Sequence, residues 1–131
     1  MSGVKTPFEH RVAVDAMGGD FGPSVVVHGA LRALPRLAEG ARIVFFGDGD
    51  AIRTEMKKAG VEPGAVDVVH APENIDMSEA PASAVRRKKR SSIVTAAKAL
   101  RDGSADAFVS AGSTGAMVAA NLLYVGRLPG V

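Results

Sequence analysis

Four short apolar runs recur along the chain, and each is followed by glycine or polar residues and then by a segment with helical spacing. The runs are rich in Val, Ile, Phe and Ala, and they predict strands over residues 11–15, 41–46, 66–70 and 107–110. Because the apolar residues are nearly continuous within each run, we expect both faces of every strand to be buried. Such strands, alternating with helices, predict a parallel sheet in an α/β fold.

The segments between the strands carry start and stop signals for helices. Ser24 precedes apolar residues spaced three or four positions apart, so we expect it to cap the first helix, which Pro35 kinks or ends. Asp50 is the expected cap of a second helix, and Gly60 is its stop signal. After a loop over 71–81, further helices are predicted from about residue 82 into a basic run, from Ser91 or Ser92 through Leu100 with Gly103 as the stop, and over 114–126.

Two segments bear on the location of the protein. Residues 107–126 include no charged residue, and about 20 apolar residues can cross a bilayer. Turn-forming residues such as Gly112 and Gly115 stand in the middle of this segment, so we expect a buried strand, a tight turn and a buried helix instead. The N-terminal residues MSGVKTPFEHR lack the apolar stretch of a signal peptide, which predicts a cytoplasmic location.

The net charge of +2 conceals one strongly basic feature, the unbroken run RRKKR at 86–90. Without these five residues, 11 basic and 14 acidic residues remain, so the rest of the chain is slightly acidic. Such a run can bind a phosphorylated ligand, an acidic protein surface or nucleic acid, or it can be a solvated helix face. No aromatic residue is interleaved with it, which disfavours binding of single-stranded nucleic acid.

The first candidate site is the glycine-rich loop after the first strand, DAMGGDFGP. In open α/β sheets, ligands bind beyond the carboxyl ends of the strands, where this loop is expected. Gly18 and Gly19 permit a close approach of a ligand to the backbone, and Asp15 at the strand end can orient a ligand or hold the loop. A simple tight turn, with Asp15 capping its amides, explains the same residues equally well.

The second candidate site is the segment SAGSTGA after the fourth strand. Free N–H groups and the positive end of the helix dipole make the start of a helix a site for anions. The hydroxyls of Ser113 and Thr114 would add donors for a phosphate. An ordinary helix cap needs only one hydroxyl, and that alternative stays open.

Other common chemistries lack their signatures in this sequence. Gly47-Asp48-Gly49 has no third glycine of the dinucleotide fingerprint, and neither a Walker motif nor a GxSxG nucleophile elbow occurs. Without cysteine, the chain has no disulfides and no thiolate ligands. We expect His28 to pack within a helix and His70 to be structural. No histidines and carboxylates have the spacing of metal ligands, so we expect no metal.

Three strings resemble the phosphate acyltransferase (PlsX) family in order and spacing: VAVDAMGGDFGP, SEAPASAVRRKKRSSI and SADAFVSAGSTGAMVAANLLYVGRLPGV. The resemblance covers about residues 11–131 and leaves 1–10 as an N-terminal extension. It implies an α/β/α sandwich of the isocitrate/isopropylmalate dehydrogenase type, incomplete here because family members continue well beyond this length. The chain would then be the N-terminal α/β portion, without the C-terminal half.

The resemblance also implies an activity and its partners. Family members transfer a fatty acyl group from acyl carrier protein to inorganic phosphate, and the acyl phosphate serves phospholipid synthesis. It further implies a homodimer that associates peripherally with the membrane. We expect no cofactor and no nucleic-acid partner. The site residues that it implies are Asp15, Arg86 and Lys89 for catalysis, Gly18, Gly19, Asp20, Ser110, Gly112, Ser113, Thr114 and Gly115 for phosphate or substrate, and Arg87, Lys88 and Arg90 for the carrier protein.

A mechanism follows as a hypothesis. Phosphate held at the 112–115 turn would attack the thioester, with backbone N–H groups and Arg86 stabilising the developing charge. The missing cysteine agrees with direct transfer rather than with an acyl-enzyme. Three alternatives remain: a phosphate acetyltransferase that uses a coenzyme A thioester, a nucleic-acid-binding module that uses the basic run, and a fragment without activity.

Overall fold

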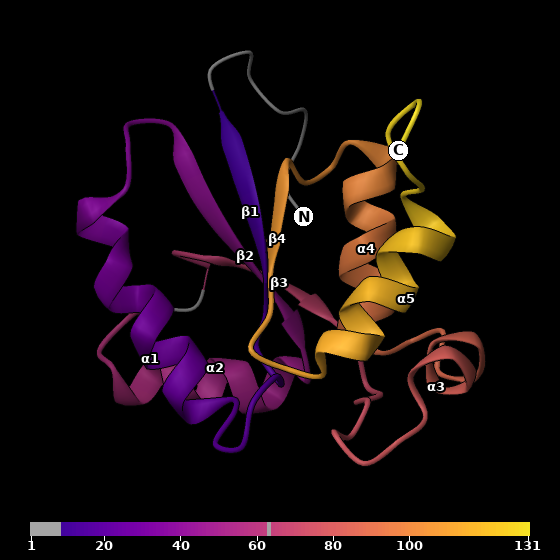
Figure 1. The fold of residues 1–131 in the computed structure, drawn as a ribbon. Helices are drawn as coiled ribbons and strands as arrows, with labels where there is room; N and C mark the ends of the chain where they lie inside the picture. Colours follow the sequence, from indigo (N-terminus) through magenta and orange to yellow (C-terminus); the bar gives the residue numbers. More distant parts are fainter. Residues whose placement is uncertain (1–8, 63) are drawn as a thin grey trace.

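A single parallel sheet forms the centre of the computed structural model, which describes residues 9–62 and 64–131 (Figure 1). The strand order is β3-β2-β1-β4, and each neighbouring pair is parallel. The parallel α/β sheet predicted from the apolar runs is therefore confirmed. The strands are β1 (His10–Asp15), β2 (Ala41–Gly47), β3 (Asp67–His70) and β4 (Ala107–Val109).

Helices cover both faces of the inner strands β1 and β2, as their continuously apolar sequences require. The prediction that every strand is buried on both faces is wrong for the edge strand β4, in which Ala107 and Val109 are exposed. In Figure 1, α1 and α2 lie on one side of the strands, and α4 and α5 lie on the other. Helix α4 contacts β1, β2 and β4, while α5 packs against α4 and α3. The helices are α1 (Ser24–Ala33), followed by the short 3₁₀ helix η1 (Leu34–Arg36), α2 (Gly49–Lys58), α3 (Pro81–Arg87), α4 (Ser92–Asp102) and α5 (Thr114–Tyr124).

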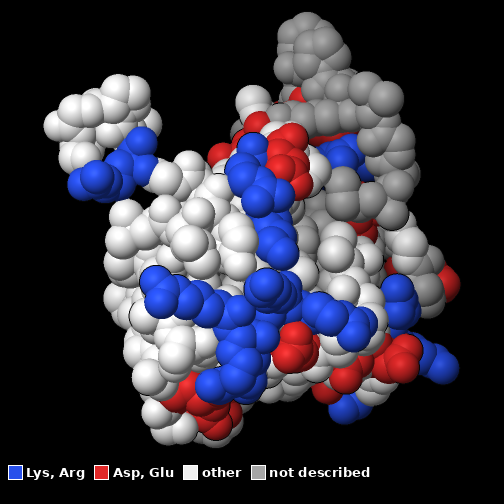
Figure 2. Space-filling view, turned by 90° about the vertical axis from the view of Figure 1, so that its right-hand side faces the viewer, with Lys and Arg blue, Asp and Glu red and all other residues white. Residues whose placement is uncertain are grey.

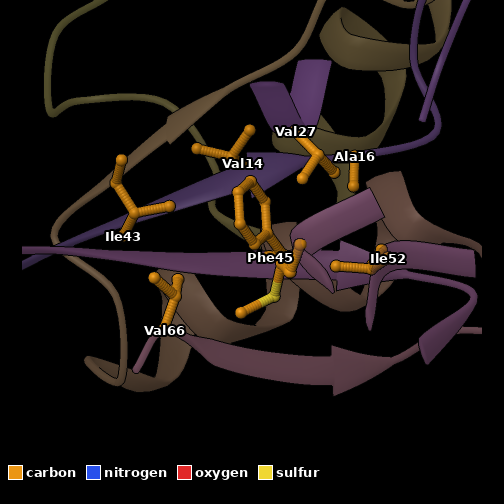
Figure 3. Packing of buried hydrophobic residues seen from close by; sticks show 8 residues of the cluster. Val14, Ala16, Val27, Ile43, Phe45, Ile52 and Val66 are labelled. Carbon is orange, nitrogen blue, oxygen red and sulfur yellow. The ribbon is translucent and has the colours of Figure 1, made fainter. Parts of the chain in front are cut away.

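The central strand β2 contributes large side chains to both faces of the sheet. Phe45 is fully buried among residues of β1, α1 and α2, including Val27 and Ile52 (Figure 3). The next residue, Phe46, is buried in the cluster on the opposite face, together with Ala96 of α4. Successive residues of a strand point to opposite faces, so this alternation accounts for the unbroken apolar sequence of β2.

Two predicted helix caps are wrong. Asp48, rather than Asp50, caps α2, because its side chain accepts hydrogen bonds from the N–H groups of Asp50 and Ala51 at 3.0 and 3.2 Å. Asp50 already lies inside the helix, too late in the chain to reach these amides. Ser24 is likewise the first residue of α1 and makes no capping hydrogen bond, since Pro23 occupies the cap position.

The other predicted boundaries agree with the structure. The α-helical hydrogen bonding of α1 ends at Ala33, just before the 3₁₀ turn that contains Pro35. Ser91 caps α4, which ends at Gly103 in the left-handed conformation. The uncharged segment 107–126 folds as the predicted strand, turn and helix, β4 and α5, and none of the helices in the described residues has the length and apolarity to span a membrane. The prediction that this strand and helix are buried is wrong, because Val109 of β4 is 56% exposed and only Ala116 and Ala120 of α5 are buried.

The remaining sequence-based expectations concern the histidines and the N-terminus. His28 lies 3.0 Å from a carboxylate oxygen of Glu55 and joins α1 to α2. His70 Nδ1 accepts a hydrogen bond from the Gly49 N–H at 3.0 Å, which is a structural contact as expected. Of the predicted extension over 1–10, residues 1–8 lie outside the described part of the chain, and His10 already belongs to β1.

The central position of Phe45 gives a test of the core. Phe45→Ala is expected to lower the free energy of unfolding by about 3–5 kcal/mol, because it leaves a cavity between β2 and α2. Urea unfolding followed by circular dichroism measures this change. Phe21→Ala serves as the control, since Phe21 is 74% exposed and its removal should change stability by about 0.5 kcal/mol or less. Equal effects of the two substitutions would contradict the assigned packing.

Candidate functional site

The two glycine-rich loops predicted from the sequence touch each other at the carboxyl ends of β1 and β4. These strands are neighbours in the sheet, so their following loops begin side by side. A Cβ atom added to Gly18 would lie only 2.7 Å from the backbone nitrogen of Gly112. Only glycine at position 18 therefore allows the two backbones to approach this closely.

A buried carboxylate connects the two loops. Asp15 is 1% exposed, and its Oδ2 accepts a hydrogen bond from the Ser110 hydroxyl at 2.7 Å. Its Oδ1 accepts a hydrogen bond from the Met17 N–H at 3.1 Å. The Ser110 oxygen in turn accepts the Gly112 N–H at 2.9 Å. Asp15 thus holds the loops together in this structure, which is one of the two roles that its sequence position left open.

At the start of α5, some polar groups already have hydrogen-bond partners and others do not. Ser113 is buried, and its hydroxyl accepts the Ala116 N–H at 3.2 Å, so it is the helix cap. Thr114 and Gly115 are exposed and occupy the first positions of the helix, whose N–H groups have no partner within it. The Thr114 hydroxyl makes no hydrogen bond to any described residue. The donors left for an anion are therefore those of Thr114 and Gly115.

One side of this helix start is covered by Pro81, the first residue of α3. A Cβ atom on Gly115 would lie 2.6 Å from Pro81 Cγ, so the glycine lets α3 pack directly against α5. The sequence alone did not associate Pro81 with the site. A proline in the first turn of a helix after a loop was the available signal, but it does not indicate which other helix it contacts.

A pocket of about 260 Å³ lies between the first glycine loop and the segment 74–77. Its charged residues are the carboxylates of Asp20 and Asp76, which oppose the binding of an anion. Hydrogen bonds from the N–H and hydroxyl of Ser78 hold the pKa of Asp76 below its usual value. The lining comprises Met17, Gly18, Gly19, Asp20, Asn74, Ile75, Asp76, Met77 and Gly112.

The basic run 86–90 is divided between ion-paired and unpaired side chains. Glu79 binds Arg87 at 2.8 Å and Lys88 at 2.7 Å, and Lys88 is the main cause that lowers the pKa of Glu79. The side chains of Arg86 and Lys89 make no ion pair with the described residues. Neither of these two lines the acidic pocket, and Arg86 instead lines a groove between α3 and α5.

The structure thus brings together part of the predicted site. Asp15, Gly18, Ser110 and Gly112 are in mutual contact, and Ser113, Thr114 and Gly115 follow directly at the start of α5. Gly19 and Asp20 line the adjacent pocket. The pocket-lining segment 74–77 was expected only as a loop. Within residues 9–62 and 64–131, no group of histidines and carboxylates has the arrangement of a metal site.

The contact through Ser110 can be tested directly. Ser110→Ala leaves an oxygen of the buried Asp15 without its donor, so the free energy of unfolding should fall by about 1–3 kcal/mol. Hydrogen exchange of the Gly112 amide should become faster, as measured by NMR. Ser83→Ala is the control, since that hydroxyl bonds only to the carbonyl of the exposed residue Ala80, the N-cap of α3. An unchanged Gly112 exchange rate in Ser110→Ala would show that the bond does not hold the second loop.

Comparisons of sequence place the chain among known proteins. Among curated relatives, the phosphate acyltransferase of Pelotomaculum thermopropionicum is 50% identical over 121 residues, and that of Oleidesulfovibrio alaskensis is 45% identical over 120 residues. Each alignment covers 92% of this chain and 34% of the relative. The chain therefore spans about a third of the length of these relatives.

A comparison of structures agrees with the observed architecture. The EutD phosphotransacetylase from Staphylococcus aureus superposes with a TM-score of 0.62 over 97% of this chain and 41% of its own length. At 16% identity, this similarity concerns the fold alone. A family model described as "Fatty acid synthesis protein" matches residues 10–131. The chain belongs to this family, as its DAMGGD and SAGSTGA motifs had indicated.

Proposed function

We propose that this chain forms the phosphate-binding part of an enzyme that transfers a fatty acyl group to inorganic phosphate. The proposal rests on the start of α5. There, Thr114 and Gly115 are exposed, and their hydrogen-bond donors have no partner within the helix. The name of the curated relatives, phosphate acyltransferase, supports the reaction class. The two carboxylates of the neighbouring pocket make the start of α5, rather than that pocket, the better site for a phosphate.

The geometry supports a preorganised anion site. The Ser113 hydroxyl accepts a hydrogen bond from the Ala116 N–H, and the Ser110 hydroxyl accepts one from the Gly112 N–H. These hydrogen bonds hold the turn rigid before a ligand binds. The N–H groups that remain point along the helix axis, where the positive end of the helix dipole favours an anion. Holding phosphate in this way lowers the entropic barrier of a reaction between two substrates.

The reaction is written as direct transfer. A phosphate oxygen attacks the thioester carbonyl carbon of acyl carrier protein and forms the new C–O bond. The tetrahedral intermediate then collapses with cleavage of the C–S bond, and the carrier leaves as a thiolate that takes up a proton. The product is an acyl phosphate for phospholipid synthesis. In this scheme Arg86 and Lys89, which make no ion pair with other described residues, stabilise the negative charge that develops.

The proposal includes the partners that the family resemblance implied. Arg90, together with Arg87 and Lys88, would attract the acidic carrier protein, an effect that salt weakens. Figure 2 shows a band of basic side chains on one face of the molecule. Glu79 already neutralises part of the charge of the run 86–90, because it pairs with Arg87 and Lys88. We also propose that the protein is a cytoplasmic homodimer that associates peripherally with the membrane.

The acyl donor can be identified by comparing the transfer rates from acyl carrier protein thioesters and from coenzyme A thioesters.

A phosphate titration of this chain tests the anion site. Inorganic phosphate should shift the NMR signals of the Thr114 and Gly115 amides, and Thr114→Ala should weaken binding roughly tenfold, because a hydrogen bond to a charged group contributes about 1.5–3 kcal/mol. Thr54→Ala is the matched control, since this exposed threonine lies on α2 and bonds to its own helix.

The proposed phosphate site is wrong if Thr114→Ala binds phosphate as tightly as the unaltered chain. It is also wrong if phosphate shifts the amides around Gly19 and Asp20 and leaves those of Thr114 and Gly115 unchanged. Titration with potassium chloride at matched ionic strength separates specific binding from a general salt effect.

A further inference from the structure

A second concave surface lies between α3 and α5, apart from the acidic pocket. It is a groove of about 350 Å³, within the size range of sites for small molecules. Leu122 and Leu123 are each 53% exposed along it, which is unusual for adjacent large apolar residues. The lining comprises Ala82, Val85, Arg86, Ala119, Leu122 and Leu123.

The single charge in this lining is the guanidinium of Arg86, and it is unpaired among the described residues. Its neighbours in the sequence are not equivalent, because Arg87 and Lys88 share Glu79. On α4, Lys98 lies over the Tyr124 ring at 5.2 Å, and Arg101 pairs with Asp102. In Figure 2, an uncharged area adjoins the band of basic side chains on this face of the molecule. The groove therefore combines an apolar wall with one available cation.

The groove lies on the same two helices, α3 and α5, that meet at the proposed phosphate site. Pro81 of α3 packs on Gly115 at the start of α5, and Ala82 and Ala119 follow in the lining. Leu122 is seven positions after Gly115, which corresponds to about 10 Å along the helix axis. An alkyl chain in the groove therefore lies within one molecule's length of the phosphate donors.

From these observations we infer that the groove between α3 and α5 binds the alkyl chain of one anionic fatty acyl compound, with its acidic head group on Arg86. Leucine and valine side chains remove the chain from water, and the guanidinium fork fits a phosphate or carboxylate with two hydrogen bonds. The identity of the compound rests on the proposed function, whose product is an acyl phosphate. The groove and its charge do not depend on that function.

Two other occupants fit the surface less well. A second copy placed symmetrically on the groove would bring two copies of the run 86–90 to one interface, which like-charge repulsion opposes. A membrane surface suits a projecting apolar helix face, whereas this surface is an open groove between two helices.

The test uses this chain and dodecyl phosphate below its micelle concentration, with binding measured by isothermal titration calorimetry. Arg86→Gln should weaken binding at least tenfold, and Leu122→Asn at least fivefold. The controls are Arg36→Gln, which removes the same charge from η1 outside the groove, and Leu128→Asn, which alters a leucine that is 76% exposed outside it. Circular dichroism verifies the fold of each variant. Dodecyl maltoside, with the same alkyl chain and no charge, should bind more weakly than dodecyl phosphate, and Arg86→Gln should remove that difference.

The inference is overturned if Arg86→Gln and Leu122→Asn bind dodecyl phosphate as the controls do. It is also overturned if light scattering shows a dimer that Leu122→Asn dissociates and dodecyl phosphate does not, or if the chain binds vesicles of anionic phospholipid but not dodecyl phosphate. Inorganic phosphate alone should not compete for the groove at concentrations that saturate the Thr114 amide. The experiments therefore distinguish a wrong assignment of the groove from a wrong assignment of the phosphate site.

Discussion

The hydrogen bonds from Ser110 and Met17 to the buried carboxylate of Asp15 determine how the rest of this edge of the sheet is arranged. A carboxylate with 1% exposure is costly unless it is hydrogen-bonded, and here one of its partners, Ser110, lies 95 positions away in the sequence. The parallel pairing of β1 with β4 brings these segments together. The carboxylate then fixes the direction in which each loop leaves the sheet.

Close packing at two glycines further restricts the loops that the Asp15 carboxylate holds together. Gly18 allows contact between the two loops, and Gly115 allows α3 to begin directly against α5. Both contacts leave less room than a methyl group needs. The backbone of the second loop therefore has few alternatives, and the start of α5 is held at the loop that follows β1. Rigid backbone donors of this kind bind an anion without a further cost of ordering.

The sequence predicted those features that depend on local chemistry. Apolar runs predicted the strands, and the serines before α4 and α5 behave as caps because a hydroxyl reaches an amide only two or three residues away. The same short range explains why Asp50, rather than Asp48, was predicted as the cap of α2. A carboxylate at either position can reach free amides, and the choice depends on where the strand before it ends.

Features that depend on two distant segments were less accessible from the sequence. The motifs indicated that Asp15 and Ser110 belong to one site, but not that each is the hydrogen-bond partner of the other. Pro81 and the segment 74–77 carry no residue pattern that identifies the loop they contact. The pairing of Glu79 with Arg87 and Lys88, which leaves Arg86 available, depends on the turn before α3 and was equally hidden.

Neighbouring surfaces of this chain differ in the sign of their charge. Asp20 and Asp76 make the pocket beside the first loop unfavourable for anions, while the amides at α5 and the guanidinium of Arg86 favour them. Under the proposed function, an anion at this edge would be repelled from the acidic pocket and attracted to the start of α5 next to it. An acyl phosphate has its negative charge at one end and an alkyl chain at the other. The groove between α3 and α5 has both kinds of environment, because the guanidinium of Arg86 lies beside the exposed apolar side chains of Leu122 and Leu123.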